Sequence, residues 1–197
     1  MCVTLVIGGA RSGKSTFAEN KAKEYGSKIA YIATSVITDK SMEDRVKKHR
    51  AQRPQEWKTI ERYKSFNELQ SDIDFLNADT IMIDCITTLI GNFMVDSRID
   101  FDNCKVEEVN LLESKIKEEV LGLISLCRKL DKKLIIVSNE VGLGVVPAYY
   151  MGNYFRDISG RINSSIAFVA DNVYFIVSGI PMKLKDKGVN IKCSEDF

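Results

Sequence analysis

Eight residues near the start of the chain read Gly8-Gly9-Ala10-Arg11-Ser12-Gly13-Lys14-Ser15. They match the pattern G-x-x-x-x-G-K-[ST], in which glycines let successive backbone N–H groups turn inward around phosphate oxygens. In this pattern Lys14 would reach the β- and γ-phosphates of a nucleotide, and the Ser15 hydroxyl would bind Mg²⁺. The stretch therefore predicts a phosphate-binding loop. The alternative is a glycine-rich turn between a strand and a helix that binds nothing.

The residues on either side of this loop favour the phosphate-binding interpretation. The apolar, β-branched run 3–7 predicts a buried strand, and residues 16–25 predict a helix. A helix that begins directly after the loop adds the partial positive charge of its N-terminus beneath a bound anion. A strand, a loop and a helix in this order are the context that the motif requires.

The rest of the chain alternates between short apolar runs and helical patterns. Four further strands are expected, over residues 28–34, 80–84, 134–137 and 172–178. Helical spacing is clearest over 105–131 and 153–170, and a further helix is expected over 41–52. Such alternation predicts an α/β fold with a mostly parallel sheet covered by helices on both faces. We expect a single P-loop nucleotide-binding domain over residues 1–185 and a polar tail over 186–197.

Composition excludes several other classes of protein. The 197 residues are 45% hydrophobic and 28% charged, and the formal net charge is +1, so no global attraction to nucleic acid or to an anionic membrane is expected. The five cysteines lack C-x-x-C spacing, which argues against a disulfide framework or a structural zinc site. No apolar run approaches the roughly 20 residues of a membrane span. A cytoplasmic protein without a membrane span is expected.

Polar side chains follow three of the predicted strands. Thr34 and Ser35 come after the second strand, Asp84 ends the third, and residues 138–140 follow the fourth. Ligands of open α/β sheets bind at the carboxyl ends of the strands, so these groups should lie near a nucleotide held by the first loop. An aspartate at the end of a buried strand beside a phosphate loop is typical of a Walker B site, which predicts that Asp84 binds Mg²⁺.

The protein has one histidine, His49, and it lies in a basic stretch. Arg45, Lys47, Lys48, Arg50 and Arg53 surround it, and Pro54 follows. One interpretation is a solvated basic helix face with an incidental histidine. The other is a phosphate-handling arm, because a neutral imidazole, with an unperturbed pKa of about 6.5, can attack phosphorus as a nucleophile near neutral pH.

These patterns leave several function classes open. They are a small-molecule kinase or nucleotidyltransferase, a nucleotide switch or motor, and an NTP-dependent nucleic-acid protein that uses the basic stretch 45–53. Lys and Arg recognise the phosphates of nucleotides and of nucleic acid alike, so the basic stretch does not choose between them.

A set of short matches in one order connects the chain to a known family. The matching segments are 8–15, 31–34, 42–57 with His49 and Trp57, 84–85, 138–142, 146–147, 155–157, 160–163 and 178–181. Over about residues 3–185 the chain resembles the bifunctional adenosylcobinamide kinase/adenosylcobinamide-phosphate guanylyltransferases of cobalamin biosynthesis. It departs from relatives after Asp84-Cys85, where Ile86-Thr87-Thr88-Leu89 replaces Leu-Thr-Leu-Trp, and at Asn163-Ser164, where relatives carry Asn-Gln.

The resemblance implies two reactions. ATP or GTP phosphorylates the aminopropanol hydroxyl of adenosylcobinamide, and GMP is then transferred from GTP to give adenosylcobinamide-GDP and pyrophosphate. His49 matches the histidine that carries GMP in the family, and Lys14 is the second expected catalytic residue. The positions that match nucleotide contacts are Gly8, Gly9, Ala10, Arg11, Ser12, Gly13, Lys14, Ser15, Thr34, Ser35, Val36, Arg50, Ala51, Gln52, Arg53, Glu61 and Asp84. Ser15 and Asp84 are the expected Mg²⁺ ligands.

The resemblance also implies a RecA-like fold, a homotrimer, and partners that are small-molecule corrinoid and nucleotide substrates rather than nucleic acid. The alternative is a P-loop regulatory or binding NTPase in which His49 is a surface histidine without covalent chemistry.

Overall fold

The computed structural model describes residues 1–36, 54 and 56–186, and in this part of the chain a seven-stranded sheet has the order β3-β2-β4-β5-β1-β6-β7. Neighbouring strands are parallel except β6 and β7, which are antiparallel. The strands are β1 Val3–Gly8, β2 Ile29–Ala33, β3 Lys58–Glu61, β4 Thr80–Asp84, β5 Lys133–Asn139, β6 Asn172–Val177 and β7 Ile180–Lys185. The predicted mostly parallel α/β sheet is confirmed.

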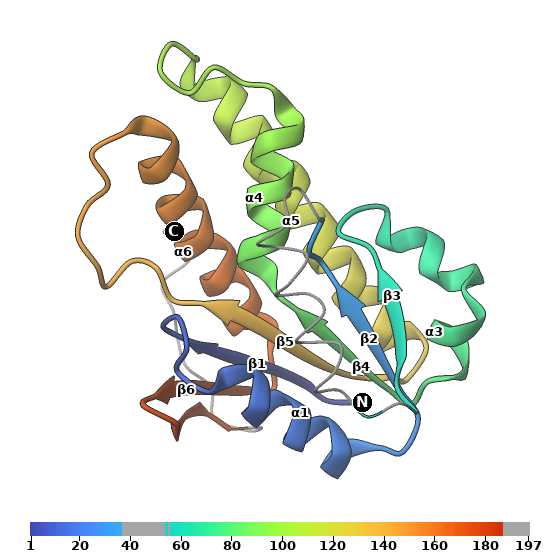
Figure 1. Cartoon of the computed structure of the whole chain (residues 1–197). Coiled ribbons are helices and arrows are strands. Elements are labelled where there is room, and N and C mark those ends of the chain that lie inside the picture. Colours follow the sequence, from blue (N-terminus) through green and yellow to red (C-terminus); the bar gives the residue numbers. More distant parts are fainter. Residues whose placement is uncertain (37–53, 55, 187–197) are drawn as a thin grey trace.

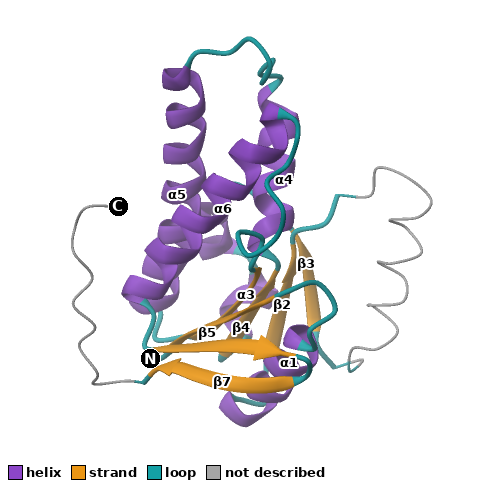
Figure 2. Ribbon diagram, turned by 90° about the vertical axis from the view of Figure 1, so that its left-hand side faces the viewer, coloured by secondary structure: helices purple, strands orange, loops and turns teal. Residues whose placement is uncertain are grey.

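Helices cover both faces of this sheet, as expected from the sequence (Figures 1 and 2). In the view of Figure 1, α1 lies below the sheet, and α4, α5 and α6 stand above it. The described helices are α1 Lys14–Tyr25, the 3₁₀ helix η1 Phe66–Ser71, α3 Ile73–Asn77, α4 Ile86–Ser97, α5 Val106–Lys129 and α6 Tyr150–Val169.

The strands are buried on both sides because successive side chains point to opposite faces. On β1, Val3 and Leu5 belong to the core cluster that contains the apolar stripe of α5. Val6 belongs to the second cluster, which lies between the sheet and α1. The stripe of α5 predicted from its three- and four-residue spacing is buried, for example at Ile116 and Val120. Burial on both faces explains why the central strands read as nearly continuous apolar runs.

The parallel strands end together at one edge of the sheet. Gly8 at the end of β1 is opposite Asn139 at the end of β5, and Ala33 at the end of β2 is opposite both Asp84 of β4 and Glu61 of β3. This carboxyl edge therefore gathers the loops that carry the predicted functional residues.

Two strands were not predicted from the sequence. β3 and β7 are the two edge strands, and their side chains are mostly exposed. Edge strands of this kind are short and carry lysines, so they lack the apolar signal of central strands. The segment after Cys85 forms α4, and the chain between β3 and β4 contains η1 and α3. In the described part of the chain, none of the helices has the length and apolar character needed to cross a membrane.

Candidate active site

The predicted phosphate loop joins β1 to α1. Gly8 is the last residue of β1, and α1 begins at Lys14. Gly13 has a φ of 93°, a left-handed conformation that suits glycine, and Arg11 has a φ of 56°. Two backbone hydrogen bonds hold the turn, because Ser12 N donates to Gly9 O over 3.3 Å and Gly179 N donates to Ser12 O over 2.8 Å. The loop thus leads directly into the N-terminus of a helix, which is the arrangement that binds phosphate.

Gly8 and Gly9 tolerate a side chain very differently. A Cβ on Gly8 would lie 2.5 Å from Ile176 O and 2.7 Å from Ser12 Oγ, whereas a Cβ on Gly9 would have no atom within 4 Å. We expect Gly8→Ala to lower the free energy of unfolding by about 1–3 kcal/mol through overpacking, and Gly9→Ala to change it by less than about 1 kcal/mol. Urea denaturation of the nucleotide-free variants measures this difference. Equal stability of the two variants would contradict the close packing of Gly8 against β6.

Lys14 lies inside the loop. Its side chain is buried, and Nζ donates a hydrogen bond of 2.9 Å to Gly9 O. Burial lowers the pKa of the Lys14 amine below its ordinary value, and the nearby Cys85 and Asp84 side chains oppose this shift. The amine is thus held over the loop, within the electrostatic reach of the end of β4.

The lowered pKa of Lys14 predicts proton uptake when a nucleotide binds. As the pH rises toward the lowered pKa, a growing fraction of the free protein loses the Lys14 proton. A bound polyphosphate stabilises the charged amine and raises its pKa again, so binding takes up a proton at pH values between the pKa of the free and of the bound protein, and binding weakens as the pH rises through this range. Titration calorimetry with GTP in buffers of different ionisation enthalpy measures the uptake. Binding heats that are independent of the buffer would contradict the prediction.

Asp84 ends β4, and its carboxylate is held by a neighbouring strand. Tyr31 of β2 donates a hydrogen bond of 3.0 Å from its hydroxyl to Asp84 Oδ2. The Ser15 hydroxyl, at the second position of α1, and the Asp84 carboxylate are hard oxygen donors of the kind that Mg²⁺ prefers, so this pair fits the ion. Among the residues described, no group of three or more His, Cys, Asp or Glu side chains is placed to hold a metal ion. Phosphate oxygens and water would therefore supply the remaining ligands.

Thr34 ties the end of β2 to the start of α4. Its hydroxyl accepts a hydrogen bond of 2.9 Å from Cys85 N and donates one of 2.8 Å to Cys85 O, while Asn92 Nδ2 donates to Thr34 O over 2.7 Å. Cys85 Sγ lies 3.2 Å from Thr87 Oγ1 and 3.0 Å from the hydroxyl of the next residue, Thr88. Burial, and then the Asp84 carboxylate, raise the pKa of the Cys85 thiol. The thiol therefore stays protonated at neutral pH.

The predicted site residues that the structure describes are spread along the carboxyl edge from β1 to β3. Lys14 is within electrostatic reach of Asp84, Thr34 after β2 makes hydrogen bonds with Cys85 next to Asp84, and Glu61 ends β3. Glu61 is four strand positions from β1 in the sheet order, about 19 Å at the usual strand spacing. His49, Arg50, Ala51, Gln52 and Arg53 lie outside the described residues.

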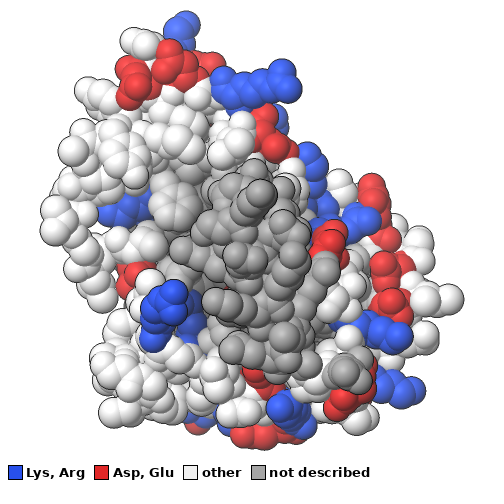
Figure 3. All heavy atoms as spheres, in the orientation of Figure 1, with Lys and Arg blue, Asp and Glu red and all other residues white. Residues whose placement is uncertain are grey.

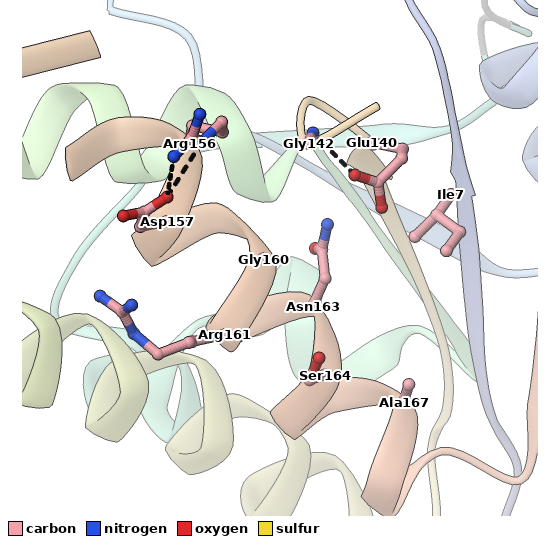
Figure 4. A pocket seen from close by; sticks show the side chains of 10 residues that line it. All are labelled: Ile7, Glu140, Gly142, Arg156, Asp157, Gly160, Arg161, Asn163, Ser164 and Ala167. Atoms are coloured by element: carbon pink, nitrogen blue, oxygen red, sulfur yellow. Dashed lines mark hydrogen bonds and ion pairs between the residues drawn. The ribbon is translucent and has the colours of Figure 1, made fainter. Parts of the chain in front are cut away.

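Two hollows open next to the phosphate loop. The first, here the P-loop hollow, has a volume of about 470 Å³ and is lined by Ala10, Thr87, Thr88, Asn139, Glu140, Val141 and Phe155. The second, here the helix hollow, has a volume of about 460 Å³ and is lined by Ile7, Glu140, Gly142, Arg156, Asp157, Gly160, Arg161, Asn163, Ser164 and Ala167 (Figure 4). Glu140 is the residue common to both linings.

Several of these residues were not predicted from the sequence to be functional. Tyr31 belongs to an expected strand and to the matching segment 31–34, but its contact with Asp84 depends on β2 lying beside β4, which no local pattern reveals. Asn139 and Glu140 were noted as polar residues at a strand end. That position and the matching segment 138–142 are the two signals that mark them.

Comparison with known proteins gives a consistent result. The family model described as "Cobinamide kinase / cobinamide phosphate guanyltransferase" matches residues 4–184. The "Bifunctional adenosylcobalamin biosynthesis protein CobU" of Escherichia coli is 40% identical over 92% of this chain and 98% of its own length. The protein of the same description from Salmonella typhimurium is 38% identical over 92% and 98%. The "Bifunctional adenosylcobalamin biosynthesis protein CobP" of Pseudomonas aeruginosa is 34% identical over 92% and 96%.

Among solved structures, the flagellar accessory protein FlaH from Methanocaldococcus jannaschii aligns with 94% of this chain and 79% of its own, with 17% identity and a TM-score of 0.45. The assignment to the P-loop α/β class rests instead on the loop geometry and on the strand order described above.

Proposed function

The chain belongs to the cobinamide kinase / cobinamide phosphate guanyltransferase family, and we propose that its two reactions share the triphosphate site built on the loop Gly8–Ser15. It is a bifunctional transferase of adenosylcobalamin biosynthesis. The observation that carries the proposal is the family match over residues 4–184, which includes a loop whose buried lysine and helix N-terminus are arranged for phosphate. Family membership sets aside the alternative of a purely regulatory P-loop protein.

In the kinase reaction, the loop N–H groups and Lys14 would hold the β- and γ-phosphates of ATP or GTP. The substrate hydroxyl attacks the γ-phosphorus, and the bond from the γ-phosphorus to the bridging oxygen breaks. Lys14 would release Gly9 O, its partner in the nucleotide-free chain, and follow the charge that develops on the leaving diphosphate. Bound Mg²⁺, held by Ser15 and Asp84, would neutralise phosphate charge.

In the guanylyl transfer, we propose that His49 is the nucleophile. A ring nitrogen of His49 would form a bond with the α-phosphorus of GTP while the bond to the bridging oxygen breaks and pyrophosphate leaves. The phosphate of cobinamide phosphate would then attack the same phosphorus and release the histidine. His49 lies in the segment between β2 and β3, and Thr34, Ser35, Val36 and Glu61 flank that segment. We propose that they, together with residues 50–53, contact the nucleoside end of GTP.

We also propose that the chain works in the cytoplasm as a homotrimer, as the family resemblance implied. Light scattering coupled to size-exclusion chromatography tests the second part, since a trimer has three times the mass of one chain.

The proposed function is tested by following two labels into the corrinoid. The full chain is incubated with adenosylcobinamide, Mg²⁺ and either γ-labelled ATP or GTP, or α-labelled GTP. Label from the γ-position in a corrinoid product reports the kinase, and label from the α-position, once the phosphorylated corrinoid is present, reports guanylyl transfer. Binding of nucleotide without transfer of either label to a corrinoid would overturn the proposal.

A further inference from the structure

We propose that the acceptor corrinoid binds across the two hollows that meet at Glu140, and that the Glu140 carboxylate receives the proton of the hydroxyl that is phosphorylated. The inference rests on the proposed function, because it assigns the acceptor side of the same kinase site. The helix hollow would take the amide-bearing rim of the corrinoid. The hydroxyl arm would extend past Glu140 into the P-loop hollow.

The backbone fixes Glu140 beside the phosphate loop. Glu140 N donates a hydrogen bond of 3.0 Å to Gly8 O, so the first residue after β5 is tied to the first residue of the loop. The side chain accepts a hydrogen bond of 2.8 Å at Oε1 from Gly142 N, and Oε2 has no hydrogen bond within the described part of the chain. Glu140 shares the P-loop hollow with Ala10 of the loop itself. A group that enters this hollow therefore lies between a carboxylate and the phosphate loop.

The helix hollow offers neutral polar groups that suit amides. Asn163 on α6 is 6% exposed, and its Nδ2 donates to Asn139 O over 3.1 Å, whereas its buried Oδ1 has no hydrogen-bond partner among the described residues. Figure 4 shows its side chain extending from α6 toward Glu140, with the amide nitrogen at the end nearer Glu140. A buried acceptor without a partner costs free energy that a ligand N–H would recover. The carboxamide side chains of a corrinoid are donors of this kind.

The two arginines that line the helix hollow are already paired. Arg156 Nη2 lies 2.8 Å from Asp157 Oδ1 on the same helix. Arg161 makes two hydrogen bonds of 2.7 Å with Glu113 on α5, and Figure 4 shows it pointing away from Asn163. This pairing favours a ligand rim that carries amides over one that carries several free phosphates.

An apolar loop flanks the hollows and gives the macrocycle a surface to cover. Between Val141 and α6, the side chains of Leu143, Val145, Val146 and Tyr149 are 79%, 95%, 63% and 65% exposed. At the left edge of Figure 3, where this loop lies in Figure 1, the outermost side chains are uncharged, and charged side chains appear further in. An exposed apolar stretch of this size beside a polar hollow is typical of a ligand or partner surface. A corrin ring combines an apolar face with an amide rim, which matches this combination.

The chemical step balances within this site. As the acceptor oxygen forms its bond to the γ-phosphorus, the O–H proton passes to the Glu140 carboxylate, and the electron pair of the breaking P–O bond leaves with the nucleoside diphosphate. Glu140 returns the proton to solvent after product release. A positioned general base of this kind contributes about 10²- to 10⁴-fold in rate.

Occupation of the helix hollow is tested by Gly160→Leu. A Cβ on Gly160 meets no atom within 4 Å, and Gly160 lines the hollow, so we expect a leucine there to occupy part of the hollow. The matched control is Gly122→Leu, since Gly122 also lies inside a helix, is exposed and has open space at its Cβ. We expect Gly160→Leu to raise the KM for adenosylcobinamide by at least about tenfold, and Gly122→Leu to leave it unchanged. GTP affinity should be unchanged in both variants.

The role of Glu140 is tested by Glu140→Gln, which keeps the acceptor oxygen for Gly142 N but removes the base. We expect kcat of the kinase to fall by about 10²-fold or more with a nearly unchanged KM for the corrinoid, and Glu140→Asp to recover part of the loss. The guanylyl transfer to phosphorylated corrinoid needs no hydroxyl deprotonation, so its rate should fall far less than the kinase rate.

The outcomes separate this inference from the proposed function. An unchanged KM in Gly160→Leu overturns the location of the acceptor, and an unchanged kcat in Glu140→Gln overturns the role of the carboxylate, each while the wild-type chain remains active. Absence of both activities in the wild-type chain overturns the proposed function itself.

Discussion

Lys14→Ala is expected to lower the rates of both the kinase and the guanylyl transfer by at least about 100-fold. Lys14 is buried within the phosphate loop and would be the side-chain cation nearest the leaving phosphates in either reaction. Removing one preorganised donor from an oxyanion hole costs about 10²- to 10³-fold in rate, and a cation that is shielded from water acts more strongly than an exposed one. The measurement is the initial rate of each reaction at saturating nucleotide.

The control for this experiment is Lys21→Ala. Lys21 lies on the same helix, and its side chain is 23% exposed. Its Nζ forms an ion pair of 2.6 Å with Glu24 Oε2. Loss of this surface pair should cost less than about 1 kcal/mol of stability and leave both rates unchanged. If Lys14→Ala kept the wild-type kinase rate, the nucleotide would not lie on this loop as proposed.

His49→Ala is expected to abolish guanylyl transfer while the kinase keeps a rate within a few-fold of the wild type. If the histidine forms the bond to the α-phosphorus, no other group replaces it, because the chain contains one histidine. The kinase transfers the γ-phosphoryl group directly to the acceptor, so it needs no covalent intermediate. Incubation with α-labelled GTP and Mg²⁺, followed by denaturation, measures protein-bound label.

The nature of the bond provides the internal check. A phosphoramidate survives alkali and is lost in acid, so the label should be acid-labile in the wild type and absent from His49→Ala. Label that persists in His49→Ala would place the covalent bond elsewhere. Equal loss of kinase and guanylyl transfer in a folded His49→Ala variant would point instead to a general defect of the nucleotide site.

The phosphate loop, the central strands and Asp84 could be predicted because the signals for them are local in the sequence. The loop Gly8–Ser15, the strand before it and the helix after it are contiguous. Their backbone conformation is therefore determined by residues that are neighbours in the sequence. The central strands were found because burial on both faces requires apolar residues at every position. Asp84 was recognised for the same reason, as a charge that ends such a run.

Other parts could not be predicted from local pattern. β3 and β7 are edge strands with exposed, partly charged side chains, and they are recognisable only once β2 and β6 offer them hydrogen-bond partners. The link between Tyr31 and Asp84 and the link between Thr34 and Cys85 join residues that are more than 50 positions apart. Both depend on β2 lying beside β4, and the sheet order is not encoded in either strand.

The amino-acid sequence by itself determined the fold class, the phosphate loop and the family, since each rests on the identity and spacing of residues along the chain. The tertiary structure alone decided which groups surround the loop. In the folded chain, Glu140 N donates a hydrogen bond to Gly8 O. Asn163, whose amide oxygen has no partner among the described residues, lines the helix hollow, and Glu140 lines both this hollow and the P-loop hollow. The physical reason is that parallel strands end at one edge, so residues far apart in sequence meet there only after the sheet has formed.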